Sequence, residues 1–470
     1  MKTFAVVTAL TLLPLSALPA AAAPGIDWKP CATEYAPTLE CASLPVSGGF
    51  SLALAKLPAT DPARRVGSLL TNPGGPGGAG VTVLKYGGRG LALDKPEMAE
   101  ARQRFDVIGF DPRGVGKSTP AIACAPELHD PALSRFPRSR ADYDKLIAHN
   151  RASGNECLER TGPALSSVDT WRAADDIEAI RVALGEPQVN WLGVSYGSEL
   201  GAVYAEKYPK RVRTMVLDGA IDHSRPTRLA ILDEAIATES ALKDFAKWCT
   251  TSSDCVLRGK DVLATYDALM RTPGGVPSKQ LGRNVTAEEL AAGIYGGLII
   301  PAFWPDVAKG IEAATAGKPD ADALVPYSQL DPSYGAYRSI GCHDFGSPFT
   351  SYPDMRAMQG LVKALAPHSW RYSEFWDITS GCAGWPVPSA YLPRPQKVSG
   401  AAPILVVGGE HDPATPLVWA KGLARNIENS TLLIDAGYGH TGLLNSACVR
   451  TEEVKYLVSG VTPAPGTVCR

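Results

Sequence analysis

Residues 66–220 alternate short strand-like runs with helical stretches, and this alternation constrains the fold more than any other feature of the sequence. Strands joined by helices must pair in parallel, because each helix carries the chain back to the starting edge of the sheet. We therefore predict an α/β fold with a mostly parallel sheet flanked by helices. Its strands are expected at 68–71, 105–110, 188–192 and 212–217, and its helices at 170–184 and 198–208.

The strand pattern stops near residue 223 and returns near residue 399. The intervening sequence holds helical pieces and loops rich in proline and aromatic residues, and strands then resume at 403–407 and 431–434. A chain of 470 residues also exceeds the roughly 100 to 200 residues of a usual domain. We predict a mainly helical cap, residues 223–398, inserted between two parts of one core, residues 23–222 and 399–470.

The N-terminus has the features of a secretory signal. Lys2 precedes an apolar run at residues 4–13, and an alanine-rich stretch follows it. This apolar run is far shorter than the roughly 20 residues that span a bilayer, so a membrane anchor is the less favoured interpretation. We predict a signal peptide over residues 1–22, with Ala23 nearly as good an exit site, and a secreted mature protein with no membrane attachment.

Cysteine usage agrees with export, because an even number of cysteines in an exported chain indicates disulfides. The chain has ten cysteines, and pairing them consecutively is the simplest arrangement. No Cys-x-x-Cys and no His-Glu-x-x-His occurs, so we expect no metal and no cofactor. The charge balance of 46 − 48 = −2 gives no electrostatic reason for a nucleic-acid partner, and a monomer is expected.

A candidate nucleophile lies in Gly-Val-Ser-Tyr-Gly at residues 193–197, where a predicted strand becomes a predicted helix. A serine on such a sharp turn adopts a strained backbone conformation, and glycines two residues to either side let neighbouring chain pass closely. The turn lifts the hydroxyl clear of the sheet edge. Ser195 is therefore the predicted nucleophile.

A serine hydroxyl needs a base, and in this arrangement an acid and then a histidine follow it along the chain. His440 comes directly after the last predicted strand and is the expected base. Asp412, just past the strand at 403–407, is the expected acid, with Glu410 and Asp435 as rivals. His411, on the same turn as the acid, is interpreted as structural.

An oxyanion hole requires backbone N–H groups aimed at the developing alkoxide. We expect one from Tyr196, the residue after the nucleophile, and one from Gly75 in the glycine-rich turn 72–80. Glycines 75, 77 and 80 also match a dinucleotide fingerprint, so a dinucleotide-dependent oxidoreductase is a remote alternative. Asp111 and Arg113, in a second turn, are expected to form an ion pair that braces it.

These motifs occur in the order Asn-Pro-Gly-Gly-Pro-Gly, Gly-Phe-Asp-Pro-Arg-Gly-Val-Gly-Lys-Ser, Gly-Val-Ser-Tyr-Gly, Gly-Gly-Glu-His-Asp-Pro and Gly-Tyr-Gly-His. The chain thereby resembles the secreted actinobacterial tripeptidyl aminopeptidases, α/β-hydrolases related to prolyl aminopeptidases. The resemblance implies the same catalytic residues and an inserted cap whose carboxylates hold the free amine of the substrate. Asp344 is the candidate for that role, and Asp331 and Glu239 are less favoured.

The predicted function is a secreted serine exopeptidase that releases di- or tripeptides from free peptide or protein N-termini through an acyl-enzyme. An extracellular carboxylesterase or lipase with the same triad is the main alternative, because the triad serves both leaving groups. A catalytically inactive hydrolase fold used for binding is disfavoured by the intact set of Ser195, Asp412 and His440.

Overall fold

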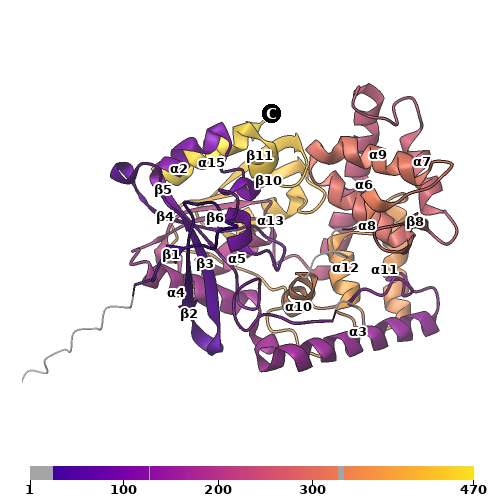
Figure 1. The fold of residues 1–470 in the computed structure, drawn as a ribbon, viewed down its shortest axis with the longest axis horizontal. Coiled ribbons are helices and arrows are strands. Elements are labelled where there is room, and N and C mark those ends of the chain that lie inside the picture. The colour runs from indigo at the N-terminus through magenta and orange to yellow at the C-terminus, as the bar shows by residue number, and fades with distance from the viewer. Residues whose placement is uncertain (1–24, 126–127, 327–332) are drawn as a thin grey trace, which may run out of the picture.

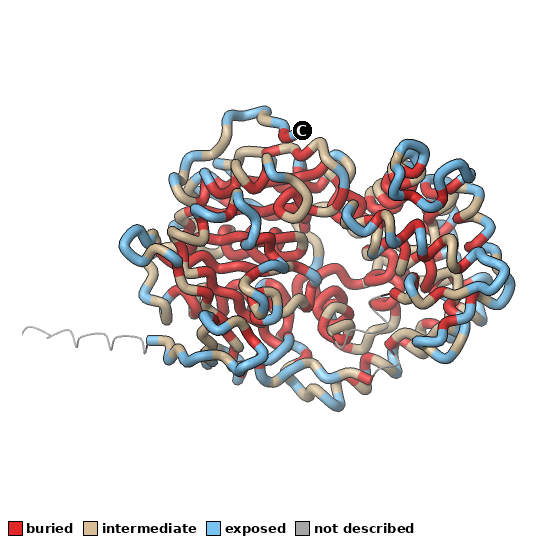
Figure 2. The backbone as a smooth tube through the Cα atoms, turned by 45° about the horizontal axis from the view of Figure 1, so that its top comes forward, coloured by how far each residue is buried: buried red, intermediate tan, exposed pale blue. Residues whose placement is uncertain are grey.

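The computed structural model describes residues 25–125, 128–326 and 333–470, so the predicted signal peptide, residues 1–22, lies outside the described residues. Figure 1 shows a sheet flanked by helices on one side of the molecule and a group of helices on the other. Figure 2 shows that buried backbone runs through both parts and that exposed residues lie around them. We use the name cap for residues 223–398, as above.

The main sheet has ten strands in the order β1-β2-β3-β5-β4-β6-β7-β10-β11-β12. Every pair from β5 to β12 in this order is parallel, which confirms the predicted α/β fold. The parallel strands are Gly67–Asn72 (β4), Phe105–Phe110 (β5), Val189–Val194 (β6), Val212–Asp218 (β7), Ile404–His411 (β10), Ser430–Tyr438 (β11) and Val468–Cys469 (β12). Three antiparallel strands that the sequence pattern did not predict extend the sheet: Lys29–Pro30 (β1), Glu40–Pro45 (β2) and Ser51–Leu57 (β3).

The central strands β4 and β6 are buried along their whole length, because helices cover both faces of the sheet. Helix Tyr196–Lys207 (α5) lies against β6, and helix Thr170–Ala183 (α4) packs against α5. Helix α5 approaches the sheet so closely that a Cβ atom on Gly201 would lie 2.4 Å from Nε1 of Trp191. This close packing fixes the start of α5 at the end of β6, where the candidate nucleophile stands.

The strand ends position the site. Because neighbouring strands are parallel, β4, β6, β7, β10 and β11 all finish at the same edge of the sheet. The residues that follow these strands include the glycine-rich turn, Ser195, Gly219, Asp412 and His440. Five loops therefore converge at one edge although they span more than 300 residues of sequence.

The cap is mainly helical, as predicted, and it has its own apolar core, which includes Leu242, Phe245, Ile294 and Trp304. A two-stranded hairpin, Val276–Ser278 (β8) and Arg283–Val285 (β9), interrupts the helices. The helices are Thr227–Thr251 (α6), Val262–Met270 (α7), Ala287–Leu298 (α8), Trp304–Ala314 (α9), Tyr334–Asp344 (α10), Tyr352–Leu365 (α11) and Glu374–Gly381 (α12). Across the described ranges no single helix is long and apolar enough to cross a membrane, although α8 and the segment Pro301–Ala314, bent by 117°, pass that test as a pair.

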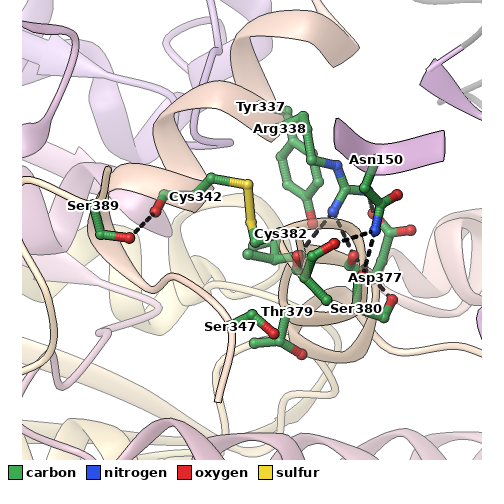
Figure 3. The surroundings of a disulfide bond; sticks show 12 residues. Asn150, Tyr337, Arg338, Cys342, Ser347, Asp377, Thr379, Ser380, Cys382 and Ser389 are labelled. Atoms are coloured by element: carbon green, nitrogen blue, oxygen red, sulfur yellow. Dashed lines mark hydrogen bonds and ion pairs between the residues drawn. A yellow bond between two sulfur atoms is a disulfide. The ribbon is translucent and has the colours of Figure 1, made fainter. Parts of the chain in front are cut away.

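A long helix from the first part of the core also contributes to the cap. Helix Arg140–Thr161 (α3) was not predicted, and the side chain of Asn150 on it donates hydrogen bonds to the carbonyls of Ser380 (2.9 Å) and Ala383 (2.8 Å). Figure 3 shows Asn150 reaching the end of α12. The proposed boundary at residue 223 therefore separates α3 from cap residues that it contacts.

Five disulfides pair the ten cysteines consecutively, which is the arrangement expected as simplest. Cys342–Cys382 joins α10 to the residue that directly follows α12 (Figure 3). Arg338 on α10 donates to Oδ2 of Asp377 on α12 at 2.7 Å, so an ion pair supports the same junction. This region of the cap is therefore covalently and electrostatically braced.

Candidate active site

Ser195 occupies the sharp turn between β6 and α5, with backbone angles of φ 57° and ψ −124°. A positive φ is costly for a serine, and such strain persists only where the surroundings enforce it. The Ser195 amide donates to the carbonyl of Asp218 at 2.8 Å. A Cβ atom on Gly193 would lie 2.1 Å from the carbonyl oxygen of Gly197, so the chain crosses itself here at a distance that only glycine permits.

Asp412 and His440 lie together. Nδ1 of His440 is 2.9 Å from Oδ2 of Asp412 and 3.0 Å from Oδ1. The carboxylate is buried and also accepts hydrogen bonds from the amides of Ala414 (2.8 Å) and Thr415 (2.9 Å). Burial favours a higher pKa for Asp412, but the charge and hydrogen bond of His440 outweigh it and hold the pKa below the ordinary value.

The rival acids do not contact His440. Glu410 is exposed, and Oδ1 of Asp435 accepts the amide of Gly437 at 3.1 Å. His411 pairs with Asp244 of the cap at 2.9 Å, in line with its interpretation as structural. Of the three carboxylates weighed from the sequence, Asp412 is the one that the structure places against the imidazole.

The backbone of the histidine loop is held from two sides. The cap loop after α8 accepts the His440 amide at the carbonyl of Ile299, at 2.7 Å. On the core side, the side chain of Asn445 donates to the carbonyl of His440 at 2.7 Å. Burial lowers the pKa of His440, but the charges of Asp412, Glu374 and Asp218 outweigh it, so the pKa lies above its ordinary value.

Ser195 and His440 converge on the residues that end β7. The carbonyl of Asp218 accepts the Ser195 amide. The next residue, Gly219, approaches the histidine loop so closely that a Cβ atom on it would lie 3.1 Å from Cε1 of His440 and 2.8 Å from Cγ2 of Thr441. The structure therefore brings the predicted nucleophile and the predicted base to the same strand end.

The glycine-rich turn lies against the nucleophile. A Cβ atom on Gly74 would be 2.8 Å from Cβ of Ser195 and 3.2 Å from the amide nitrogen of Tyr196. The Gly74 amide donates to Oδ1 of Asn72 at 3.0 Å and is thereby engaged. In the described part of the chain the amides of Gly75 and Tyr196, the two proposed oxyanion donors, donate no hydrogen bond.

The dinucleotide interpretation of this turn has no geometric support. A Cβ atom on Gly77 would lie 2.9 Å from the amide nitrogen of Tyr337 on α10, and one on Gly80 would lie 2.3 Å from the carbonyl oxygen of Phe110. These fingerprint glycines therefore face protein backbone. The helix that follows, Gly80–Leu84 (α1), has only five residues.

Asp344 differs from its expected role as the amine ligand. It is fully buried, and its oxygens accept the Thr170 amide (3.1 Å) and the Thr170 hydroxyl (2.6 Å). The same hydroxyl contacts the phenol of Tyr196, and both oxygens of Asp344 already have protein partners, which does not fit the expected role of amine ligand. Burial and the charge of Glu199 raise its pKa well above the ordinary value.

The other sequence candidates also have different environments. Glu239 is buried and accepts the amides of His368 and Ser369, and Asp331 lies outside the described residues. The expected pairing of Asp111 with Arg113 is wrong. Arg113 instead pairs with Asp176 on α4 at 2.6 Å, and Asp111 accepts the amides of Val81 (2.9 Å) and Lys117 (2.8 Å).

Sequence reasoning missed two neighbouring cap carboxylates, and the charge of one of them, Glu374, acts on the histidine. Glu374, the first residue of α12, is close enough for its charge to act on His440, and burial raises its pKa to about 7. Glu234 on α6 is fully buried, and its Oε2 accepts the Phe375 amide at 2.7 Å. Burial and the charge of Glu374 raise the pKa of Glu234 well above the ordinary value.

Polar groups beside this carboxylate pair are unsatisfied. Oε1 of Glu234, the hydroxyl of Thr238 and the phenol of Tyr295 are buried and have no hydrogen-bond partner within the described ranges. Thr238 and Tyr295 line one small cavity together with Tyr372. Buried polar atoms normally find a partner, so this group is suited to a ligand that donates hydrogen bonds.

No sequence signal marks these two glutamates. Glu234 stands in an ordinary amphipathic helix, and Glu374 occupies a first-turn position where acidic residues are common. Glu234 and its partner Phe375, the neighbour of Glu374, are 141 residues apart in the chain, so only the fold brings them together. Within the described residues, no group of three or more His, Cys, Asp or Glu side chains is arranged to hold a metal ion.

Comparison with known proteins gives two family matches. An α/β hydrolase fold model matches residues 68–269, and a TAP-like protein model matches residues 368–469. Among curated proteins, serine protease Hip1 of Mycobacterium tuberculosis is 30% identical over 485 residues, covering 94% of this chain and 91% of that protein. Tripeptidyl aminopeptidase of Streptomyces lividans is 31% identical over 480 residues (96% and 87%), and carboxylesterase B of M. tuberculosis is 32% identical over 487 residues (95% and 90%).

Proposed function

Because this chain belongs to the tripeptidyl aminopeptidase family of α/β-hydrolases and is a serine hydrolase, we propose that it releases di- or tripeptides from free N-termini. We further propose that it acts outside the cell. The signal-like N-terminus and five disulfides support that location, because disulfides persist in oxidising compartments.

In the proposed reaction, Oγ of Ser195 attacks the scissile carbonyl carbon while His440 takes the serine proton. The amides of Gly75 and Tyr196 stabilise the oxyanion of the tetrahedral intermediate. The carbon–nitrogen bond then breaks, and His440 gives its proton to the departing amine. Water, deprotonated by His440, attacks the acyl-enzyme, and the peptide acid leaves as Ser195 regains its proton.

Asp412 serves this cycle without becoming protonated. Its contacts with Nδ1 of His440 fix the tautomer in which the other ring nitrogen is free to accept the serine proton. The raised pKa of His440 and the lowered pKa of Asp412 have the signs expected of an imidazolium stabilised by a buried carboxylate.

The pair Glu234 and Glu374 is the observation that carries the choice of an aminopeptidase. Both carboxyls have raised pKa values, and Glu234 and its neighbours leave hydrogen-bond acceptors unused. A protonated α-amine supplies three N–H donors and a positive charge, which satisfies the acceptors and stabilises the ionised carboxylates. The acyl chain of an ester offers neither. The pair therefore favours peptides with a free N-terminus over acyl esters.

The test compares a chromogenic tripeptide with its N-acetylated form, using the mature chain and its Ser195→Ala variant. Acetylation removes the positive charge, so we expect kcat/KM for the free-amine substrate to exceed that for the acetylated one by at least about 100-fold. Ser195→Ala abolishes both activities. Equal rates on the two substrates, or faster hydrolysis of a simple acyl ester, contradict the proposal and favour the esterase.

A further inference from the structure

Asp218, the last residue of β7, connects the two loops that carry the proposed nucleophile and base. Its main-chain carbonyl accepts the Ser195 amide at 2.8 Å. Its carboxylate accepts two amides just beyond His440, from Gly442 (3.0 Å, to Oδ1) and from Leu443 (2.6 Å, to Oδ2). One residue thus bonds to both sides of the proposed catalytic centre.

The two amides that Asp218 receives begin the short helix Gly442–Asn445 (α14). The first amides of a helix have no acceptor within it, so a carboxylate that binds two of them sets where the helix starts. His440 stands two residues before this start, and Thr441 between them has the strained φ of 67°. The direction of the imidazole therefore depends on how Asp218 fixes the helix.

Asp218 is a charged group in a fully buried place. Its side chain has no exposed surface, and burial raises its pKa to about 6 even though the Leu443 and Gly442 amides oppose this. His440 attracts the carboxylate and Asp412 repels it. From helix Ala447–Ser459 (α15), Glu453 faces it, and Arg450 on that helix partly offsets the Glu453 carboxyl.

We propose that Asp218 is a positioning residue of the reaction, which holds the His440 loop in register with the Ser195 turn. This inference rests on the proposed roles of Ser195 and His440. Asp218 thereby joins Ser195, Asp412 and His440 as a fourth residue on which the reaction depends. Its side chain touches neither the substrate nor the imidazole. Burying a carboxylate costs free energy, and a neutral side chain of similar size would fill the same space without that cost. The two amide bonds give the carboxylate a role that such a side chain lacks, namely holding the start of α14.

Asp218→Asn tests the proposal in the full mature chain. An asparagine retains one acceptor but presents an NH₂ group to the other amide, so one of the two bonds is lost. We expect the rate of Ser195 labelling by a fluorophosphonate, and kcat per labelled site, to fall about 10- to 100-fold, with KM changed by less than about threefold. Glu453→Gln, which alters a neighbouring buried acid without touching the histidine loop, is the matched control and keeps near-normal labelling.

The pH profile separates positioning from simple stability. The negative charge of Asp218 favours the imidazolium, so its removal lowers the pKa of His440 and moves the acid limb of the labelling rate to lower pH by roughly half a unit. A variant that merely unfolds loses labelled sites but leaves the limb in place. Normal labelling per site with an unmoved limb overturns the proposal.

Hydrogen exchange of the wild-type chain decides the matter if Asp218→Asn fails to fold. The amides of Gly442 and Leu443 should lose protection as pH falls through about 6, where Asp218 takes up a proton. The Thr441 amide, which donates to Asp412 at 3.2 Å, should stay protected and is the internal reference. Equal protection of all three amides across this range overturns the proposal. Failure of wild-type labelling contradicts instead the proposed role of Ser195.

Discussion

Carboxylates of the core and of the cap meet near His440, and the two sets differ in how far their hydrogen bonds are satisfied. In the core, both oxygens of Asp412 accept bonds from His440, and neighbouring amides and the Thr415 hydroxyl also donate to them. In the cap, Glu234 keeps one oxygen without a partner, beside an unpaired phenol of Tyr295, within the residues described. The first set is complete as folded, whereas the second has the form of a site that a ligand completes.

Asp412→Asn should give the largest effect, because it breaks the complete set. An amide in place of the carboxylate turns the imidazole to the wrong tautomer, and we expect kcat to fall about 10⁴-fold with little change in KM. Steady-state kinetics on a chromogenic tripeptide measures it. Glu410→Gln, two residues away and exposed, is the matched control and should retain full activity. A comparable loss in Glu410→Gln would reassign the acid.

Glu374→Gln should act mainly on the cap set, with a smaller effect through the charge that Glu374 exerts on His440. Losing one charged partner for the substrate amine is expected to raise KM for free-amine tripeptides about 10- to 100-fold, with a smaller change in kcat. The N-acetylated peptide is the internal reference, since it has no charge to lose and its KM should not change. If both substrates are weakened equally, Glu374 supports the site structurally and binds no amine.

The smallest expected effect is a dependence of KM on pH. Glu374 has a pKa of about 7, so below that pH it takes up a proton and loses its attraction for the substrate amine. Above about pH 8 the amine itself is neutral. KM for the free-amine peptide should therefore be lowest between these values and rise severalfold by pH 6, whereas the acetylated peptide should give a flat profile. Parallel profiles for both peptides would remove the carboxylate from amine binding.

Much of the core was predictable because its signals are local. The wholly buried strands β4 and β6 appear as continuous apolar runs, and Ser195 is marked by glycines that crossing chains require. His440 and Asp412 follow strand ends whose positions the same pattern gives. In each case a few adjacent residues contain the information.

The cap could not be predicted in this way, because tertiary contacts decide the role of each acid. Asp344 accepts a hydrogen bond from the hydroxyl of Thr170, 174 positions away in the chain. Glu234 accepts one from the amide of Phe375, 141 positions away. Helix α3 was missed for a related reason. Its buried face includes Asn150 and Gly154, so no apolar stripe marks it, and its fit becomes evident only where Asn150 meets α12.

The bond from the His440 amide to the carbonyl of Ile299 has a consequence for how such enzymes change over time. Through this bond the cap helps to hold the backbone of the proposed base, so one cap cannot be exchanged for another without affecting His440. A chimera that carries the cap of a homologue would have to keep a carbonyl in the position of Ile299, so that the His440 amide retains its acceptor. Diversification of substrate range is thus expected to spare the turn between α8 and α9 while the rest of the insertion varies.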